Sequence, residues 1–156
     1  MEREHRFEAQ TIWTGAAHGP TRDLATFSRE FRVDITGKAP LTGSSAPAFA
    51  GDAKLHNPED LMLASLSACH MLSYLALCAR AGIAVLTYED HATGTLGQVD
   101  RTFRFTEVVL RPRVRLAAGA DVAKATALHE RAHALCFMAA SVNFPVRNEP
   151  SVEVAE

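Results

Sequence analysis

Residues 57–82 read NPEDLMLASLSACHMLSYLALCARAG, and this stretch decides the fold. Residues 61–79 contain no Asp, Glu, Lys or Arg. Asn57 can cap free backbone N–H groups, Pro58 suits the first helical position, and Gly82 can take the left-handed conformation that ends a helix. We therefore expect one long buried helix of about 24 residues, about 36 Å in length, which runs through the middle of the fold.

An uncharged stretch of this length would also span a lipid bilayer. It contains three serines and one histidine, however, and no Lys/Arg cluster that would orient a membrane span stands beside it. The first ten residues, MEREHRFEAQ, hold no apolar run of the kind found in signal peptides. We therefore expect a helix in the core of a cytoplasmic protein, with no membrane partner.

Composition limits the remaining possibilities. The length of 156 residues predicts a single domain over residues 1–156. The net charge of −2, with both signs scattered along the chain, gives no surface for nucleic acid. Three cysteines, an odd number, argue against a framework of structural disulfides and favour reduced thiols that are available for chemistry.

The flanking segments predict an α+β domain, with antiparallel sheets packed around the long central helix. Alternating apolar residues predict strands, and Gly, Pro and Ser predict the loops between them. We expect strands at 6–14, 27–35, 84–95, 102–116 and 151–154, loops at 15–26 and 42–54, and a second helix from Asp121 to about Leu135. The strands 84–95 and 102–116 should pair around Gly97.

The cysteines can be compared by helix geometry. Cys69 and Cys78 lie nine positions apart on the long helix, which separates their Cα atoms by about 13 Å. A disulfide needs Cα atoms within about 7 Å, so these two cannot pair within one intact helix. Cys136 belongs to another element and is not excluded: if there is a redox pair, it is Cys69 with Cys136. Cys78 is best interpreted as a core residue, because small thiols are often buried.

A reactive Cys69 needs a nearby cation or hydrogen-bond donor. An arginine from residues 20–32 could supply it, and Glu59 could orient that arginine, but Glu59 lies about 15 Å from Cys69 along the helix. In a two-fold pair of antiparallel helices that cross at Ala64, Glu59 of one subunit would face Cys69 of the other. The small residues near Ala64 would equally allow a sheet to pack on the helix.

The chain resembles the osmotically inducible protein C and organic hydroperoxide resistance family. The resemblance covers nearly the whole chain, and its most specific part is the order and spacing of two cysteine motifs. The matching residues are Asn57-Pro58-Glu59-Asp60-Leu61, Ala68-Cys69-His70-Met71-Leu72, Ala81-Gly82-Ile83, Cys136-Phe137-Met138 and Ser141-Val142, with Gly37-Lys38, Gly43-Ser44-Ser45 and Gly51-Asp52 similar to one branch. This resemblance implies a thiol peroxidase, built as an intertwined homodimer with two active sites at the subunit interface.

The resemblance also implies the roles of individual residues. Cys69 matches the peroxidatic cysteine, Cys136 the resolving cysteine, and Glu59 the carboxylate that orients an arginine. Arg29 matches that arginine in one branch and Arg22 in another; we favour Arg29. Cys69 would reduce an organic hydroperoxide, and an external dithiol of the lipoyl type would reduce the resulting disulfide, without a bound cofactor.

Two other hypotheses come from different classes. The sequence His129-Glu130-Arg131-Ala132-His133 matches the H-E-x-x-H pattern of zinc hydrolases, in which two histidines at positions i and i+4 bind the metal. No third ligand stands at a recognised spacing, although Cys136 or His70 could serve. The third hypothesis is a non-catalytic binding protein on the same fold, with Cys69 as an inert thiol.

Overall fold

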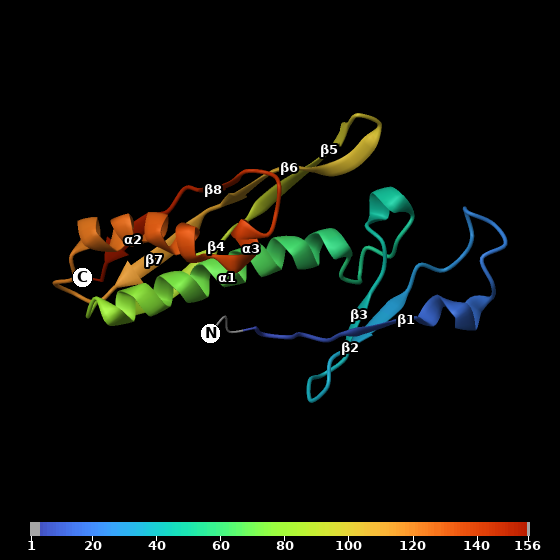
Figure 1. Cartoon of the computed structure of the whole chain (residues 1–156), viewed down its shortest axis with the longest axis horizontal. Helices are drawn as coiled ribbons and strands as arrows, with labels where there is room; N and C mark the ends of the chain where they lie inside the picture. Colours follow the sequence, from blue (N-terminus) through green and yellow to red (C-terminus); the bar gives the residue numbers. More distant parts are fainter. Residues whose placement is uncertain (1–3, 156) are drawn as a thin grey trace. The chain divides into compact units, whose positions relative to one another are not determined.

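The computed structural model describes residues 4–155 (Figure 1). The chain forms two compact units, residues 1–61 and 62–156, and each is described by itself. The single domain over residues 1–156 that we expect from the sequence therefore stays a prediction.

The first unit contains an antiparallel three-stranded sheet of order β1-β2-β3. Its elements are β1 (Gln10–Trp13), the 3-10 turn η1 (Thr14–His18), β2 (Phe31–Asp34), β3 (Leu41–Gly43) and the 3-10 turn η2 (Pro47–Phe49). The first two strands confirm the predicted ones but are shorter, and β3 lies at the start of a predicted loop. Gly43 is required in β3, because a Cβ there would lie 2.3 Å from the ring of Phe31.

Helix α1 (Pro58–Arg80) confirms the predicted long helix (green in Figure 1). At its start, the Asn57 side-chain oxygen accepts a hydrogen bond from the Asp60 N–H at 2.9 Å, and the Asn57 amide donates to the Asp60 carboxylate at 2.8 Å. At its end, Gly82 has a left-handed φ of 70°, and the Ile83 N–H donates to the Cys78 carbonyl at 2.9 Å. Both ends are therefore closed by the residues that the sequence indicates.

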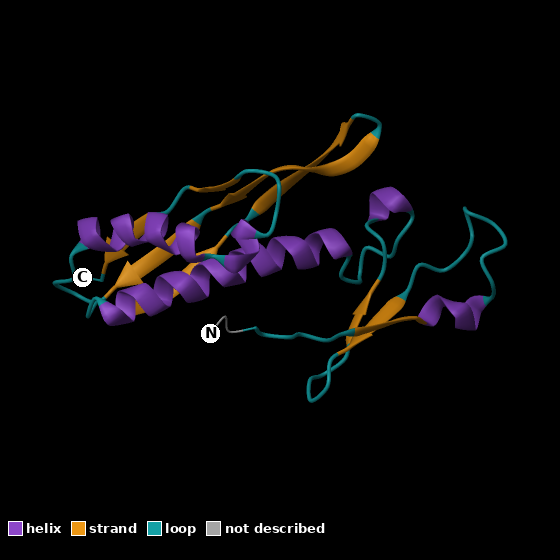
Figure 2. Cartoon of the chain, in the orientation of Figure 1, coloured by secondary structure: helices purple, strands orange, loops and turns teal. Residues whose placement is uncertain are grey.

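The second unit also contains two three-stranded sheets, of order β4-β7-β9 and β5-β6-β8 (orange in Figure 2). Its remaining elements are β4 (Val85–Asp90), β5 (Thr93–Val99), β6 (Thr102–Leu110), β7 (Pro112–Leu116), α2 (Val122–Leu135), α3 (Phe137–Ala140), β8 (Val146–Asn148) and β9 (Ser151–Val154). The α+β class is confirmed, with parallel pairing added where β8 joins β6 and β9 joins β7.

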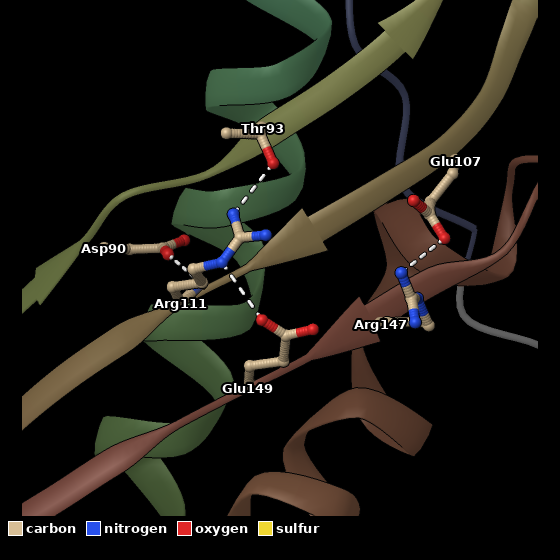
Figure 3. Close-up of polar contacts among 6 residues, drawn as sticks. All are labelled: Asp90, Thr93, Glu107, Arg111, Arg147 and Glu149. Atoms are coloured by element: carbon tan, nitrogen blue, oxygen red, sulfur yellow. Dashed lines mark hydrogen bonds and ion pairs between the residues drawn. The ribbon is translucent and has the colours of Figure 1, made fainter.

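Each of the two long predicted strands is divided in two at one place, where Arg111 links the pieces (Figure 3). The Arg111 N–H donates to the Asp90 carboxylate at 2.7 Å, while its guanidinium donates to Thr93 at 2.8 Å and to Glu149 at 3.0 Å. Asp90 ends β4 and Thr93 begins β5. Single-strand alternation gives no sign of such a side-chain link.

The hairpin β5–β6 confirms the predicted pairing of these segments, but the predicted turn at Gly97 is wrong. Gly97 lies inside β5 and pairs with Arg104, and the chain turns at Asp100 and Arg101. Both turn residues have left-handed φ angles, 49° and 66°. The glycine attracted the prediction, whereas an aspartate and an arginine take the conformation that the turn requires.

Helix α1 buries one side and leaves another exposed. Leu66, His70, Tyr74, Leu77 and Cys78 are its buried residues, and they belong to or lie beside the two clusters of the core. Ala64, Ala68 and Leu72 are exposed, Leu72 by 62%. Among the described residues α1 is also the one helix whose length and composition would permit a membrane span. Its buried side is that of a core helix.

Candidate thiol site

Cys69 and Cys136 come together from two different helices of the second unit. Cys69 lies half-buried on α1, and Cys136 is 2% exposed at the junction of α2 and α3. Cys69 lies close enough to Cys136 to raise the pKa of its thiol, and both cysteines are free. The structure thus brings together the two cysteines that the sequence singled out, without a covalent bond between them.

Cys136 ends one helix and begins the next. Its N–H donates to the His133 carbonyl at 3.1 Å, which closes α2, and its Sγ accepts a hydrogen bond from the Ala139 N–H at 3.4 Å, which opens α3. The extended backbone of Cys136 separates the two helices. The helix expected to end at about Leu135 does end there, and the break that follows places the Cys136 sulfur beside the Ala139 N–H.

The environment of Cys136 acts on its thiol in two directions. Burial raises the pKa of Cys136, and so does the neighbouring Cys69 side chain. The Ala139 N–H lowers the pKa, because it stabilises the thiolate. Cys136 is therefore kept as a thiol near neutral pH, but the Ala139 N–H is in place to stabilise the thiolate once the proton leaves.

Cys78 is 1% exposed within the core, as predicted. Burial raises the pKa of its thiol, and the neighbouring Tyr74 side chain opposes this in smaller measure. A buried, apolar environment makes a cysteine inert. Cys78 therefore has a packing role, which fits its position about 13 Å from Cys69 along α1.

Glu59 and Arg29 lie in the first unit, so the structure does not relate them to Cys69. Glu59 stands in the first turn of α1, and its Oε2 is buried without a hydrogen-bond partner among the described residues. Arg29 donates to the carbonyls of Phe27 at 3.0 Å and Leu24 at 2.6 Å, and its guanidinium lies 4.2 Å from the centre of the Phe27 ring. Arg22 is exposed. The roles of Glu59, Arg29 and Arg22 stay predictions.

A buried pair of histidines, His70 and His129, was not predicted as a unit. His70 Nε2 and His129 Nδ1 lie 3.0 Å apart, and the two side chains are 0% and 1% exposed. The ring of Tyr74 stacks on His129 with 3.8 Å between centroids. Burial lowers the pKa of both histidines to about 4, with a smaller contribution from His133 to His70 and from His70 to His129.

The histidine pair changes the interpretation of the H-E-x-x-H pattern. Nδ1 of His129 is engaged with His70, Glu130 is exposed, and His133 is half-buried. Within residues 4–155, no group of three or more His, Cys, Asp or Glu side chains is arranged to hold a metal ion. His129 is thus a histidine buried on a helix, and the described residues around it do not form the ligand set of a zinc site.

A carboxylate on β4, missed by the sequence analysis, connects α1 to the sheets. Asp90 accepts a short hydrogen bond from the Ser67 hydroxyl on α1 and a second one from the Arg111 N–H. Ser67 lies two residues before Cys69, so this contact fixes the rotation of α1 near the thiol. The sequence hinted at such a contact only through the polar Ser67 in an uncharged helix. Spacing alone could not identify Asp90 as its partner.

The model of the family described as OsmC-like protein matches residues 51–150, which include both cysteines. Among solved structures, an OsmC-like protein of unknown function from Vibrio cholerae is 28% identical, with 95% of this chain and 100% of that chain covered and a TM-score of 0.88. No curated protein matches the chain.

Two further structures are named organic hydroperoxide resistance proteins. The one from Elizabethkingia anophelis is 21% identical, covers 99% of this chain and 100% of its own, and has a TM-score of 0.71. The one from Bacillus subtilis is 21% identical, with 93% and 98% coverage and a TM-score of 0.63. At this identity the likeness shows the shared fold alone.

Proposed function

The chain belongs to the OsmC-like protein family, and on that premise we propose that it is a thiol-dependent peroxidase that reduces organic hydroperoxides to alcohols. The observation that carries the proposal is the closeness of Cys69 and Cys136, two free cysteines from separate elements, of which Cys69 raises the pKa of the Cys136 thiol. Structures of the same fold that are named for organic hydroperoxide resistance support the choice of substrate.

The reaction uses the two thiols in sequence. The Cys69 thiolate attacks the distal oxygen of a hydroperoxide, ROOH, so that the O–O bond breaks and Cys69 becomes a sulfenic acid. The leaving RO− takes a proton from water and departs as the alcohol ROH. The Cys136 thiol then condenses with this sulfenic acid, and a disulfide and one water form. An external dithiol, of the lipoyl type in our proposal, reduces the disulfide and is itself oxidised.

The surroundings of Cys136 suit the second step. Burial keeps its sulfur protonated, and hence unreactive, while the Ala139 N–H is positioned to stabilise the thiolate as the proton leaves. Phe137 and Met138 follow Cys136 and are 81% and 38% exposed. Their apolar side chains would favour the organic group of a hydroperoxide over hydrogen peroxide.

In our proposal, Arg29 and Glu59 support Cys69 across the interface of a homodimer. Glu59 has a buried carboxylate oxygen without a partner in the described chain, and Ala64, Ala68 and Leu72 form an exposed apolar side of α1. Two copies of α1 crossing near Ala64 would cover this side and bring the partner subunit's Glu59 toward Cys69. We propose that Arg29, held by Glu59, stabilises the Cys69 thiolate and the charge of the transition state in a cytoplasmic enzyme.

The deciding experiment treats reduced protein with cumene hydroperoxide and maps disulfides by mass spectrometry. We expect a bond between Cys69 and Cys136 in the wild-type protein and in Cys78→Ser, and a trapped sulfenic acid on Cys69 in Cys136→Ser. Cys78→Ser is the matched control, because it removes a third thiol that lies in the core. Free thiols that remain unchanged after treatment would refute the peroxidase proposal.

A further inference from the structure

Each histidine of the pair His70 and His129 lies on the same helix as one of the two cysteines or on the helix that leads to it. His70 follows Cys69 directly on α1, and His129 precedes Cys136 by seven residues, about two turns of α2. The bond of 3.0 Å between Nε2 of His70 and Nδ1 of His129 is therefore a direct polar link between the helix of one thiol and the helix of the other.

The link is directional and closely surrounded. The two imidazole planes are within 9° of parallel, and Tyr74 stacks on His129 at 13°. Tyr74, on α1, and Ala125 and Ala132, on α2, are fully buried in the same core cluster. A hydrogen bond in such a setting restricts how the helices slide and rotate past one another, whereas apolar contacts alone tolerate more displacement.

The polar histidine pair stabilises the core less than apolar side chains would. Nδ1 of His70 and Nε2 of His129 are buried without a hydrogen-bond partner in the part of the chain that the structure describes. Unpaired buried nitrogens of this kind destabilise a fold, and leucines of similar volume would avoid the loss. A polar pair kept at this place fits a role in geometry better than a role in stability.

We propose that His70 and His129 are positioning residues that hold α1 and α2 in the register at which Cys136 reaches Cys69. This inference rests on the proposed dithiol chemistry of the two cysteines. The histidines take no part in bond making: Cys136 loses its proton and attacks the sulfenic sulfur of Cys69, and water leaves, whether or not the pair is present. The pair sets how often the two sulfurs meet.

The proposal is tested by the effective concentration of one thiol toward the other. Protein is equilibrated with glutathione and glutathione disulfide, and the fraction with a Cys69–Cys136 disulfide is measured by mass spectrometry after acid quenching. Each disulfide formed consumes one glutathione disulfide and releases two glutathione molecules. The ratio of oxidised to reduced protein, multiplied by the square of the glutathione concentration and divided by that of glutathione disulfide, therefore gives the effective concentration. Hydroperoxide has no part in this measurement, so a protein without peroxidase activity still tests the histidine pair.

Two kinds of substitution separate the hydrogen bond from packing. His129→Asn and His70→Gln keep an amide near the position of the bonded nitrogen, whereas His129→Leu and the double variant His70→Leu/His129→Leu remove the bond. The double variant is included because replacement of both partners by apolar groups often preserves folding. Val114→Ala, a change elsewhere in the same core cluster, controls for general loosening.

We expect the effective concentration to fall about fivefold to tenfold in the leucine variants, the change that the loss of one hydrogen bond produces. The amide variants and Val114→Ala should stay within about twofold of the wild-type protein. A folded double leucine variant with the wild-type value would overturn the proposal. An equal fall in the amide and leucine variants would also overturn it, because packing rather than the bond would then control the approach of the thiols.

Discussion

The Nε2 atom of His70 and the Nδ1 atom of His129 face each other at 3.0 Å between α1 and α2, inside the core of the second unit. One of these nitrogens must donate and the other accept, so at least one ring is neutral. His133 and Asp90 act on the charge of His70, while Tyr74 stacks on His129 and contacts Tyr88. Asp90 favours a charged His70, but burial outweighs it.

The first prediction concerns stability as a function of pH. Because the pKa of both histidines is about 4 in the folded protein and 6.5 is the ordinary value, the unfolded chain binds more protons between these limits. The contribution to stability is thus fully present above pH 6.5 and is lost as the pH falls through about 4. Urea titrations from pH 7.5 to 4 should show this loss, and His70→Leu/His129→Leu should flatten the curve. A wild-type curve as flat as that of the variant would contradict the assignment.

The second prediction concerns the start of α1. Asn57→Ala should lower the free energy of unfolding by about 1 kcal/mol, because the Asp60 N–H loses its acceptor. Urea denaturation measures the change. Asn57→Ser, which keeps an oxygen in reach of that N–H, should recover most of it. If both variants were equally destabilised, the cap would not be the cause.

The third prediction distinguishes the two arginines. Arg29→Gln should lower the rate constant for oxidation of Cys69 by cumene hydroperoxide by about 10²-fold, the typical effect of removing one group that stabilises transition-state charge. Arg22→Gln, at an exposed position, should change it by less than twofold. Rapid quenching followed by mass spectrometry of Cys69 gives the rates. The reverse order of the two effects would assign the role to Arg22.

The fourth prediction concerns assembly. Ala64→Glu places a charge at the proposed crossing point of two α1 helices and should convert the dimer to a monomer, measured by light scattering. The matched control is Ala127→Glu, the same change at an exposed position of α2. We expect the control to stay dimeric. A monomeric wild-type protein would remove the premise that Glu59 acts across subunits.

The fifth prediction concerns metal. Protein purified without chelator should contain far less than one zinc per chain, and EDTA should leave its peroxidase activity unchanged, because the described residues offer no set of three ligands. Elemental analysis gives the stoichiometry. One equivalent of zinc that is lost in His129→Asn or His133→Asn would instead support the hydrolase hypothesis.

The sequence predicted best the features whose causes are local. Asn57, Pro58 and Gly82 indicated both ends of α1. Asp121, the predicted start of the second helix, caps α2, and its side chain accepts from the Lys124 N–H. Each of these acts on backbone groups within four residues. The resemblance to a known family singled out Cys69 and Cys136 as the two cysteines of the candidate site.

The features that were missed depend on partners far apart in the chain. Ser67 bonds to Asp90, and His70 to His129 across 59 positions. The three-residue strands β3 and β8 are likewise held by pairing with β2 and β6, not by their own alternation. Spacing along one element cannot reveal such contacts, because tertiary packing decides them.

Cys136 Sγ is also the acceptor that begins α3, through the Ala139 N–H. A sulfur engaged in a disulfide has a different position and a weaker charge, so oxidation at this atom would change how firmly the first turn of α3 is held. Phe137 and Met138 belong to that turn. The oxidation state of Cys136 Sγ would in this way change how well the exposed apolar side chains of Phe137 and Met138 are ordered. A reductant could recognise that change without contact with the buried sulfur.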